Sequence, residues 1–402
     1  MAVRQPPYLL RLKVKNFRSL RDVEVRLAAL NVLVGPNGAG KSNLLDVIAF
    51  LGDATRDDLA PALETRGGFD RVRFRGSPAR DAISIEVEAA VTRNSSLRAT
   101  DNYTLSFFRR PLRGRTEVYL LRREESFAFK RTAGPGRRIT VDGNRITFHR
   151  PQGPEQTASL REGSLGLSTL PKLSAAEGGE QVEALGDLFA SFRVFDVDVA
   201  AARRPSTEQV SAELADDASN LAAFLAYLGT EHPERFGALQ RDAQAFIPGL
   251  ESLDFTPIGG AGEGMVLTLA ERELPGATTL REASYGSVRA LALLALLYDP
   301  APPRLTCIEE IDHGLHPHVL DRLVELLREA AKRTQFLIAT HSPALVNRLA
   351  PEELIVCEKG TDAASRIPAI DPATVRDMER ALHGEIGLGE LWFTGALGGV
   401  PT

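Results

Sequence analysis

The sequence predicts an α/β fold in which a mixed β core carries an antiparallel β layer and an inserted helical lobe. Three observations predict this fold. A glycine-rich loop at residues 35–40 follows a short apolar strand and precedes a helix. Residues 82–150 contain several stretches of alternating apolar and polar residues, which indicate antiparallel strands. Residues 288–357 alternate helix and apolar strand, which favours parallel strands joined by crossover helices.

The order of the elements along the chain supports this fold. In chain order, the pattern predicts paired strands at 8–17 and 23–27, a strand at 30–34, a helix at 41–50, antiparallel strands within 82–150, helices within 181–246, a strand-rich stretch at about 250–280, a helix at 288–298, a strand at 304–308, a helix at 319–331, and strands at 335–339 and 354–357. Residues 151–180 hold Pro, Gly and Ser with little periodicity, which predicts a linker or loop.

Length and composition predict two or three lobes. The chain has 402 residues, of which 43% are hydrophobic and 25% charged. These are ordinary globular values, and a domain averages about 150 residues. We expect an N-terminal part at 1–150 with the glycine-rich loop and the antiparallel layer, an inserted and mostly helical lobe at 151–250, and a C-terminal part at 251–402 that completes the core.

The sequence lacks the features of secreted and membrane-spanning proteins. The longest apolar run, residues 290–298, is less than half of a bilayer span. The N-terminal residues lack the apolar core of a signal peptide. The two cysteines, Cys307 and Cys357, lie within apolar runs, as buried reduced thiols do. We therefore expect a cytoplasmic protein with no disulfide and no contact with a membrane.

The charges are distributed unevenly along the chain. Residues 1–150 hold 28 Lys and Arg against 16 Asp and Glu, a net charge of +12. Residues 151–402 hold 20 against 37, a net charge of −17. This polarity makes DNA a candidate partner of the arginine-rich N-terminal part, including the cluster of Arg and Phe at 66–75. Solvation of strand edges explains the same charges equally well.

The most specific motif lies at residues 35–42, which fit the pattern G-x-x-x-x-G-K-[ST] between a strand and a helix. The glycines let the backbone bend so that several N–H groups point at a phosphate chain, at the positive end of a helix. We expect Lys41 to reach the β- and γ-phosphates of a nucleotide and Ser42 to bind Mg²⁺. The predicted binding residues are Gly35, Pro36, Asn37, Gly38, Ala39, Gly40, Lys41, Ser42 and Asn43.

Two later apolar strands end in residues suited to phosphate chemistry. The strand at 304–308 runs into Glu309 and Glu310. The first carboxylate at such a strand tip can hold Mg²⁺, and the next can polarise an attacking water. The strand at 335–339 runs towards His341, which can donate a hydrogen bond to a terminal phosphate. Taken alone, a histidine in this place is more often structural.

A fourth motif, at residues 284–287, precedes the apolar helix at 288–298. Ser284 is a natural N-terminal cap, and Gly286 follows two residues later. A helix N-terminus also favours phosphate, so capping and phosphate binding are compatible roles at this position.

In this order the motifs resemble the ABC-type ATPase heads of the RecF, SMC and OLD families, and most closely the small bacterial SMC-like ATPases of the AAA family. Residues 14–20 and 309–317 resemble phrases of these families as well, whereas residues 55–280 offer little to match. The resemblance implies a P-loop NTPase of ABC/RecF type that binds ATP and Mg²⁺. It implies that Glu309 serves Mg²⁺, that Glu310 is the catalytic base, and that His341 is a switch.

The resemblance also implies a dimer that forms with ATP. Two heads would enclose two ATP molecules. Ser284 and Gly286 of one chain would contact the γ-phosphate held by Lys41 and Ser42 of the other. The dimer would close when the γ-phosphate is present and relax after hydrolysis.

The sequence departs from the family pattern at three places. The segment at 284–287 reads Ser-Tyr-Gly-Ser instead of Ser-Gly-Gly-Gln. Glu309 replaces the commoner Asp, which moves its carboxylate by one methylene. No Gln occurs within 43–150, so the glutamine that couples Mg²⁺ to the rest of the head has no counterpart there.

The expected function is ATP binding and slow hydrolysis coupled to dimerisation, in DNA repair and recombination or in anti-phage defence. The alternative is a non-catalytic scaffold or switch, gated by ATP, for a partner protein or nuclease. Because the sequence shows no nuclease signature of its own, any cleavage would need a partner. The histidines at 313, 316 and 318 are assigned to the turn after the carboxylates in preference to a zinc site.

Overall fold

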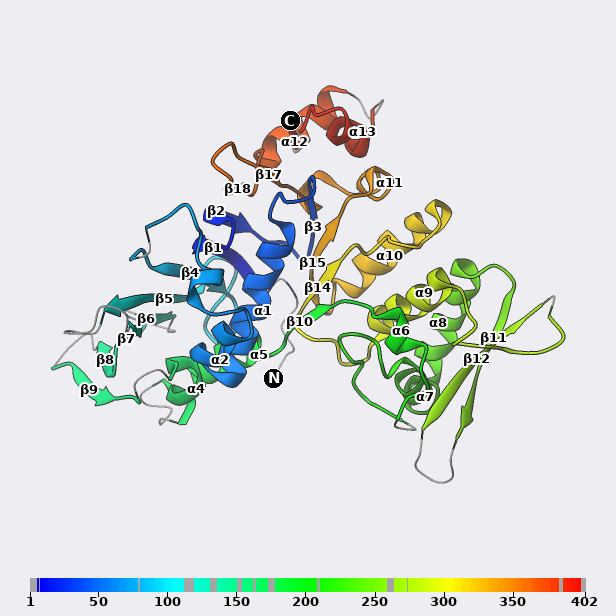
Figure 1. Cartoon of the computed structure of the whole chain (residues 1–402), viewed down its shortest axis with the longest axis horizontal. Coiled ribbons are helices and arrows are strands. Elements are labelled where there is room, and N and C mark those ends of the chain that lie inside the picture. The colour runs from blue at the N-terminus through cyan, green and yellow to red at the C-terminus, as the bar shows by residue number, and fades with distance from the viewer. Residues whose placement is uncertain are drawn as a thin grey trace.

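The computed structural model describes residues 6, 8–78, 80–111, 119–130, 136–149, 154–161, 164–172, 178–207, 210–258, 264–272, 274–382 and 386–398. The chain forms an antiparallel sheet, a central parallel sheet and a helical lobe, which lie side by side along the long axis of the molecule (Figure 1). Within the described ranges, no helix has both the length and the apolar character needed to cross a bilayer.

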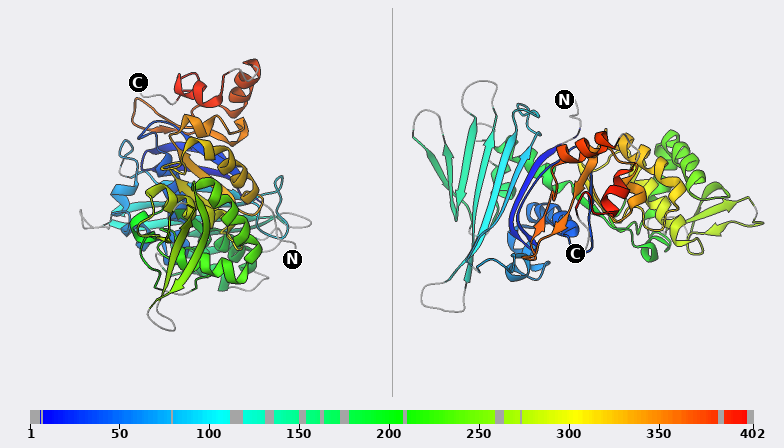
Figure 2. Two further views of the ribbon diagram at one scale, coloured as in Figure 1. Left: turned by 90° about the vertical axis from the view of Figure 1, so that its right-hand side faces the viewer. Right: turned by 90° about the horizontal axis from the view of Figure 1, so that it is seen from above.

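The N-terminal part builds an antiparallel sheet, as the alternation of its residues predicts. Its described strands are β1 (Leu9–Phe17), β2 (Leu20–Arg26), β4 (Ile83–Ala89), β5 (Asp101–Pro111), β6 (Tyr119–Phe129), β7 (Arg137–Asp142), β8 (Arg145–His149) and β9 (Gln156–Ser159). Their order is β2-β1-β4-β5-β6-β7-β8-β9. Burial alternates strictly along β4, because one face of the sheet packs on the core and the other faces solvent. Figure 2 shows this sheet extending away from the rest of the molecule.

The central sheet is parallel and gathers strands from distant parts of the chain. Its strands are β10 (Phe192–Phe195), β14 (Leu305–Glu309), β15 (Gln335–Thr340), β3 (Leu30–Val34) and β16 (Leu354–Val356), in that order. β3 and β15 are buried along their whole length, which explains why most of their residues are apolar. Thr340 pairs with Val34 and Glu309 with Ala339, so β3, β14 and β15 end at the same edge.

The two faces of the central sheet belong to two apolar cores. Val32, Val34 and Ile338 contribute to the core shared with the helical lobe. Leu33 and Leu337 contribute to the core shared with the antiparallel sheet. Because successive residues of a strand point to opposite faces, one short strand supports both cores.

Helices cover the sheets and build the lobe. On the side of the antiparallel sheet lie α1 (Lys41–Asp57), α2 (Leu59–Glu64), α3 (Phe69–Val72), α4 (Gly166–Thr169) and α5 (Gly179–Ala190). The lobe contains α6 (Val199–Ala202), α7 (Leu221–Glu231), α8 (Pro233–Phe246), α9 (Tyr285–Tyr298), β11 (Leu250–Pro257), β12 (Met265–Glu271) and β13 (Thr278–Thr279). The remaining α-helices and strands of the described residues are α10 (Leu320–Ala330), α11 (Pro343–Val346), β17 (Glu358–Lys359), β18 (Ser365–Arg366), α12 (Pro372–Ala381) and α13 (Leu388–Phe393), and 3₁₀ turns lie at Pro317–Val319 and Pro351–Glu353.

Two sequence expectations are refined by the structure. The stretch at 151–180, expected to be a linker, contains β9 and α4 and a 3₁₀ turn at Leu170–Lys172. β10, from the expected helical segment, pairs with β14 and extends the parallel sheet. The division of the chain at residues 150 and 250 stays a prediction. Cys307 and Cys357 are buried free thiols.

Candidate functional site

The glycine-rich loop connects β3 to α1 and has a backbone that larger residues could not adopt. A Cβ on Gly35 would overlap the carbonyl oxygen of Cys357. Gly40 has a φ of 99°, in the left-handed region, and a Cβ there would overlap the Ser365 hydroxyl. No side chain caps the N-terminus of α1, so its first backbone N–H groups are available to an anion.

Lys41 is the cation of the loop. Its ammonium donates hydrogen bonds to the carbonyl oxygens of Gly35 at 2.8 Å and Pro36 at 3.0 Å, and the residue is only 6% exposed. Burial lowers the pKa of Lys41, and the negative charges near it, Glu309 and Glu310 among them, counteract that effect. The backbone carbonyl oxygens therefore hold the Lys41 ammonium in place beside any anion bound in the loop.

Ser42 and Glu309 place two oxygens side by side. The Ser42 hydroxyl donates to Oε2 of Glu309 at 2.9 Å. Oxygen ligands of this kind suit Mg²⁺, which binds proteins through one or two carboxylates and shares its remaining positions with water and phosphate. The donor set therefore fits a Mg²⁺ ion accompanying a bound phosphate.

Glu310 follows β14 with an unusual backbone conformation. Its φ is 47°, in the left-handed region that residues with a Cβ seldom occupy. Its N–H donates to the carbonyl oxygen of Ala339 at 2.9 Å. Its carboxylate lies 3.6 Å from Nδ1 of His313, and its side chain is 59% exposed. This carboxylate is accessible to water, as a base acting on water requires.

His341 follows β15 and is positioned by the turn around it. The Thr340 hydroxyl donates to Asp312 at 2.6 Å and accepts a hydrogen bond from the Ser342 N–H at 3.0 Å. Burial and the nearby Lys41 charge lower the pKa of His341, against the opposing pull of Glu310 and Asp312. The imidazole is therefore neutral near pH 7, with one nitrogen as a donor.

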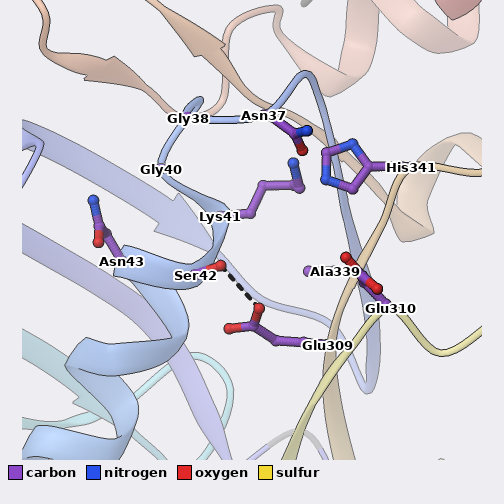
Figure 3. A pocket seen from close by; sticks show the side chains of 10 residues that line it. All are labelled: Asn37, Gly38, Gly40, Lys41, Ser42, Asn43, Glu309, Glu310, Ala339 and His341. Carbon is purple, nitrogen blue, oxygen red and sulfur yellow. Dashed lines mark hydrogen bonds between the residues drawn. The ribbon is translucent and has the colours of Figure 1, made fainter. Parts of the chain in front are cut away.

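These side chains line one cavity of about 200 Å³ (Figure 3). Its lining residues are Asn37, Gly38, Gly40, Lys41, Ser42, Asn43, Glu309, Glu310, Ala339 and His341. Figure 3 shows the Lys41 and His341 side chains above the two carboxylates, with the start of α1 to their left. Of the predicted loop residues, Gly35, Pro36 and Ala39 are outside this lining set.

Ser284 and Gly286 are not part of this cavity. Ser284 caps α9 by accepting a hydrogen bond from the Ser287 N–H at 3.0 Å. Gly286 packs against Gly314, so closely that a Cβ would lie 2.5 Å from its carbonyl oxygen. The side chain of Tyr285 between them is exposed. Within one chain, this segment contacts the loop that follows Glu310, and the residues that line the cavity come from the other motifs.

Sequence reasoning missed Ser19 and Ser365, two serines that lie next to the glycine-rich loop on the side away from the cavity and contact it through Asn43. The Asn43 amide donates to the Ser19 hydroxyl at 2.7 Å, and this hydroxyl lies 2.6 Å from that of Ser365. Ser19 belongs to the stretch at 14–20 that carries part of the family resemblance, whereas no sequence signal marks Ser365.

Arg66, one of the arginines of the cluster at 66–75, serves the fold. Its guanidinium pairs with Asp46 at 2.8 Å and Asp53 at 2.7 Å, and its side chain is 9% exposed. It also lies over the ring of Phe50. The charge of Arg66 is therefore satisfied on the surface of α1, and nucleic-acid binding by the cluster at 66–75 stays a prediction.

The three histidines of the turn after the carboxylates point to different neighbours. His316 and His318 contact each other, with 2.6 Å between their Nδ1 atoms. His313 contacts Tyr285 and Glu310 instead. Among the described residues, no group of three or more His, Cys, Asp or Glu side chains is arranged to hold a metal ion.

Comparison with known proteins places this site in a family. A family model described as "AAA domain, putative AbiEii toxin, Type IV TA system" matches residues 30–347. An OLD nuclease of Thermus scotoductus is 46% identical over 57 residues, which are 14% of this chain and 10% of the nuclease. The DNA replication and repair protein RecF of Magnetococcus marinus is 42% identical over 57 residues, 14% of this chain and 15% of RecF. The matched segments thus span a small part of either relative.

Solved structures are similar to this chain over most of its length. An Smc head domain with an extended coiled coil, bound to the C-terminal domain of ScpA derived from Pyrococcus furiosus, aligns over 94% of this chain and all of its own, with 15% identity and a TM-score of 0.50. This likeness concerns the fold. Since the family model covers more than half of the chain, the protein belongs to the AAA-domain family described above, and its fold is similar to that of an Smc head domain.

Proposed function

We propose that this protein binds ATP with Mg²⁺ in the cavity around Lys41 and hydrolyses it slowly, and that two chains enclose two nucleotides. The observation that carries the proposal is the convergence of Lys41, Ser42, Glu309, Glu310 and His341 on one cavity at the carboxyl edge of the parallel sheet. Ligands bind at this edge in open α/β sheets.

Each residue has a role that its position supports. Lys41 and the N–H groups at the start of α1 would bind the β- and γ-phosphates. Ser42 and Glu309 would hold Mg²⁺, whose charge would neutralise the phosphate oxygens. Glu310 would accept a proton from the attacking water. Neutral His341 would donate its N–H to the γ-phosphate, and its hydrogen bond would be lost after hydrolysis.

The proposed dimer accounts for the placement of α9. Ser284 and Gly286 lie at the N-terminus of a 14-residue helix but do not line the cavity of their own chain. A helix N-terminus attracts phosphate. In the proposed dimer, this segment contacts the γ-phosphate held by the other chain, so that ATP joins the two chains and hydrolysis releases them.

The proposed process is DNA repair and recombination or anti-phage defence. The net charge of +12 within residues 1–150 supports DNA as a partner. The names of the two curated relatives, a nuclease and a DNA replication and repair protein, support the same process. A partner nuclease or repair protein would supply any cleavage.

The test measures ATP turnover and molar mass in solution, with and without DNA, for the wild type and for Glu310→Gln. We expect slow turnover in the wild type, and an ATP-bound dimer that accumulates in the variant because ATP binds but is not cleaved. Wild-type protein that retains ATP through a single-turnover experiment would instead identify a scaffold gated by ATP. Absence of ATP binding would overturn both functions.

A further inference from the structure

A buried arginine, Arg289, lies directly behind the two carboxylates of the site. The residue is 4% exposed. Its Nη2 donates to the backbone carbonyl oxygens of Glu309 at 3.2 Å and Glu310 at 2.6 Å. Its Nε is buried without a hydrogen-bond partner, and no carboxylate among the described residues forms an ion pair with it. A buried charge without a counter-ion is costly, so its persistence suggests a role beyond packing.

The backbone that Arg289 holds is the strained part of the site. Glu310 adopts its left-handed conformation with its N–H bonded to Ala339 and its carbonyl oxygen bonded to Arg289. Such a conformation persists only where its surroundings fix it. The His313 N–H also donates to the Glu310 carbonyl oxygen at 2.9 Å. Arg289 therefore supplies one of the three hydrogen bonds that hold the backbone of Glu310, and it helps to set the direction of the carboxylate.

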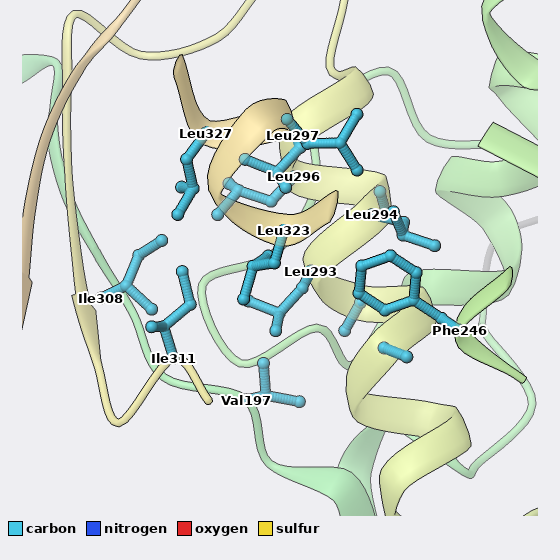
Figure 4. Close-up of a cluster of buried hydrophobic side chains, with 14 of the residues drawn as sticks. Val197, Phe246, Leu293, Leu294, Leu296, Leu297, Ile308, Ile311, Leu323 and Leu327 are labelled. Atoms are coloured by element: carbon cyan, nitrogen blue, oxygen red, sulfur yellow. The ribbon is translucent and has the colours of Figure 1, made fainter. Parts of the chain in front are cut away.

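Arg289 belongs to α9, one turn after Gly286. This helix is buried from Val288 to Leu297. Figure 4 shows Leu293 and its neighbours packed towards Ile308 and Ile311, which flank the two carboxylates. Gly286 also packs against Gly314 on the far side of the same turn. A displacement of the N-terminus of α9 is therefore transmitted to the segment that carries Glu310, because tightly packed elements move together.

We propose that Arg289 is a positioning residue that couples the two nucleotide sites of the dimer. The N-terminus of α9 would contact the nucleotide of the other chain, and Arg289 on the same helix would set the backbone of Glu310 in its own cavity. Nucleotide in one site thereby permits hydrolysis in the other. This coupling rests on the proposed function, whereas the positioning of Glu310 by Arg289 does not depend on a nucleotide.

The experiment compares Arg289→Met, which keeps the buried volume without the charge, with Arg289→Lys, which can reach one carbonyl but not two. Arg333→Met is the matched control. Arg333 also donates to two carbonyl oxygens, of Leu297 at 3.1 Å and Asp299 at 2.6 Å, but at the opposite end of α9. Circular dichroism and thermal melting establish whether each variant is folded. If Arg289→Met does not fold, Arg289→Lys is used for the same measurements.

The first measurement needs no nucleotide. Amide hydrogen exchange of a peptide covering residues 305–312 is followed in the free protein. We expect exchange at least about tenfold faster in Arg289→Met than in the wild type, with Arg289→Lys between them and Arg333→Met unchanged. Equal exchange in the wild type and in both Arg289 variants would overturn the positioning role.

The second measurement separates binding from turnover. We expect Arg289→Met to bind ATP within about threefold of the wild-type Kd, because Arg289 does not line the cavity. Its kcat should fall about tenfold or more, and the dependence of rate on ATP should change from sigmoidal to hyperbolic. Faster exchange together with a wild-type kcat and a sigmoidal curve would overturn the coupling. Faster exchange in a protein whose wild type never hydrolyses ATP would overturn the proposed hydrolysis and leave the positioning role standing.

Discussion

The Ser42 hydroxyl donates a hydrogen bond to Oε2 of Glu309 at 2.9 Å, although the two residues are 267 positions apart in the sequence. Ser42 lies at the start of α1 and Glu309 at the end of β14. The contact exists because β14 and β3 both pair with β15, in a register that aligns the ends of all three strands. The contact between Ser42 and Glu309 is therefore a product of strand order.

Removal of the loop cation should abolish nucleotide binding. In Lys41→Ala the two carbonyl oxygens of Gly35 and Pro36 lose their donor, and the phosphates lose their nearest charge. We expect the Kd for ATP to rise by about a hundredfold or more, measured by calorimetry. Lys332→Ala removes an exposed lysine just after α10 and is the control. Unchanged affinity in Lys41→Ala would place the nucleotide elsewhere.

Loss of the Glu310 carboxylate should separate binding from turnover. Glu310→Gln keeps the size of the side chain but cannot accept a proton from water. We expect ATP affinity to change by about twofold at most and kcat to fall by about a hundredfold or more, measured with a phosphate-release assay. Glu358→Gln, in the short strand β17, is the matched control. Turnover at the wild-type rate would exclude Glu310 as the base.

Ser284→Arg should prevent closure of the dimer without disturbing the cavity. The substitution adds a long charged side chain at the N-terminus of α9, where it opposes the close approach of a partner. We expect normal ATP binding by the monomer and no increase in mass with ATP, measured by light scattering in the Glu310→Gln background. Ser284→Ala removes only the cap and should still dimerise. Dimerisation of Ser284→Arg at the wild-type level would contradict contact between α9 and the nucleotide of the other chain.

If the N-terminal part binds DNA, exposed arginines of the antiparallel sheet should carry the affinity. Arg138 and Arg145 lie on the adjacent strands β7 and β8 and are both exposed. We expect the affinity for DNA to fall steeply as the salt concentration rises. The double variant Arg138→Glu/Arg145→Glu should bind DNA more weakly at every salt concentration, and its affinity should depend less steeply on salt. Arg66→Gln should instead lower the melting temperature, because Arg66 is paired with Asp46 and Asp53. A salt-independent affinity would exclude a phosphate-backbone contact.

The lowered pKa of His341 should appear in the pH dependence of stability. The unfolded chain binds a proton at this histidine near its ordinary pKa of about 6.5, whereas the folded chain binds it only at lower pH. Between these two pKa values, the unfolded state holds more protons, so stability rises with pH and is lost as pH falls through the window. We expect His341→Asn to reduce the gain in unfolding free energy between about pH 5.5 and about pH 7.5, measured by urea unfolding. An identical gain in wild type and variant would show that the folded state does not disfavour the charged ring.

The sequence by itself determined the local parts of the site. The glycine pattern at 35–40 specifies a bend that only small residues tolerate, and the structure shows why at Gly35 and Gly40. Each apolar strand and the polar residue after it could also be found from the sequence, because burial on both faces of a parallel sheet leaves a continuous apolar run. The alternating strands within 82–150 were equally clear, since one face of that sheet meets solvent.

Only the tertiary structure decided which of these parts meet. The hydrophobic pattern of a strand shows which face is buried but does not specify the order of the strands in the sheet. The approach of Glu309, Glu310 and His341 to Lys41 depends on that order, through the pairing of β3, β14 and β15. The same holds for the Ser365 hydroxyl behind the loop, for the two aspartates that engage Arg66, and for the carbonyl oxygens that Arg289 holds. Each of these contacts forms only when distant segments of the chain pack together. The local sequence around one residue therefore does not reveal its partner.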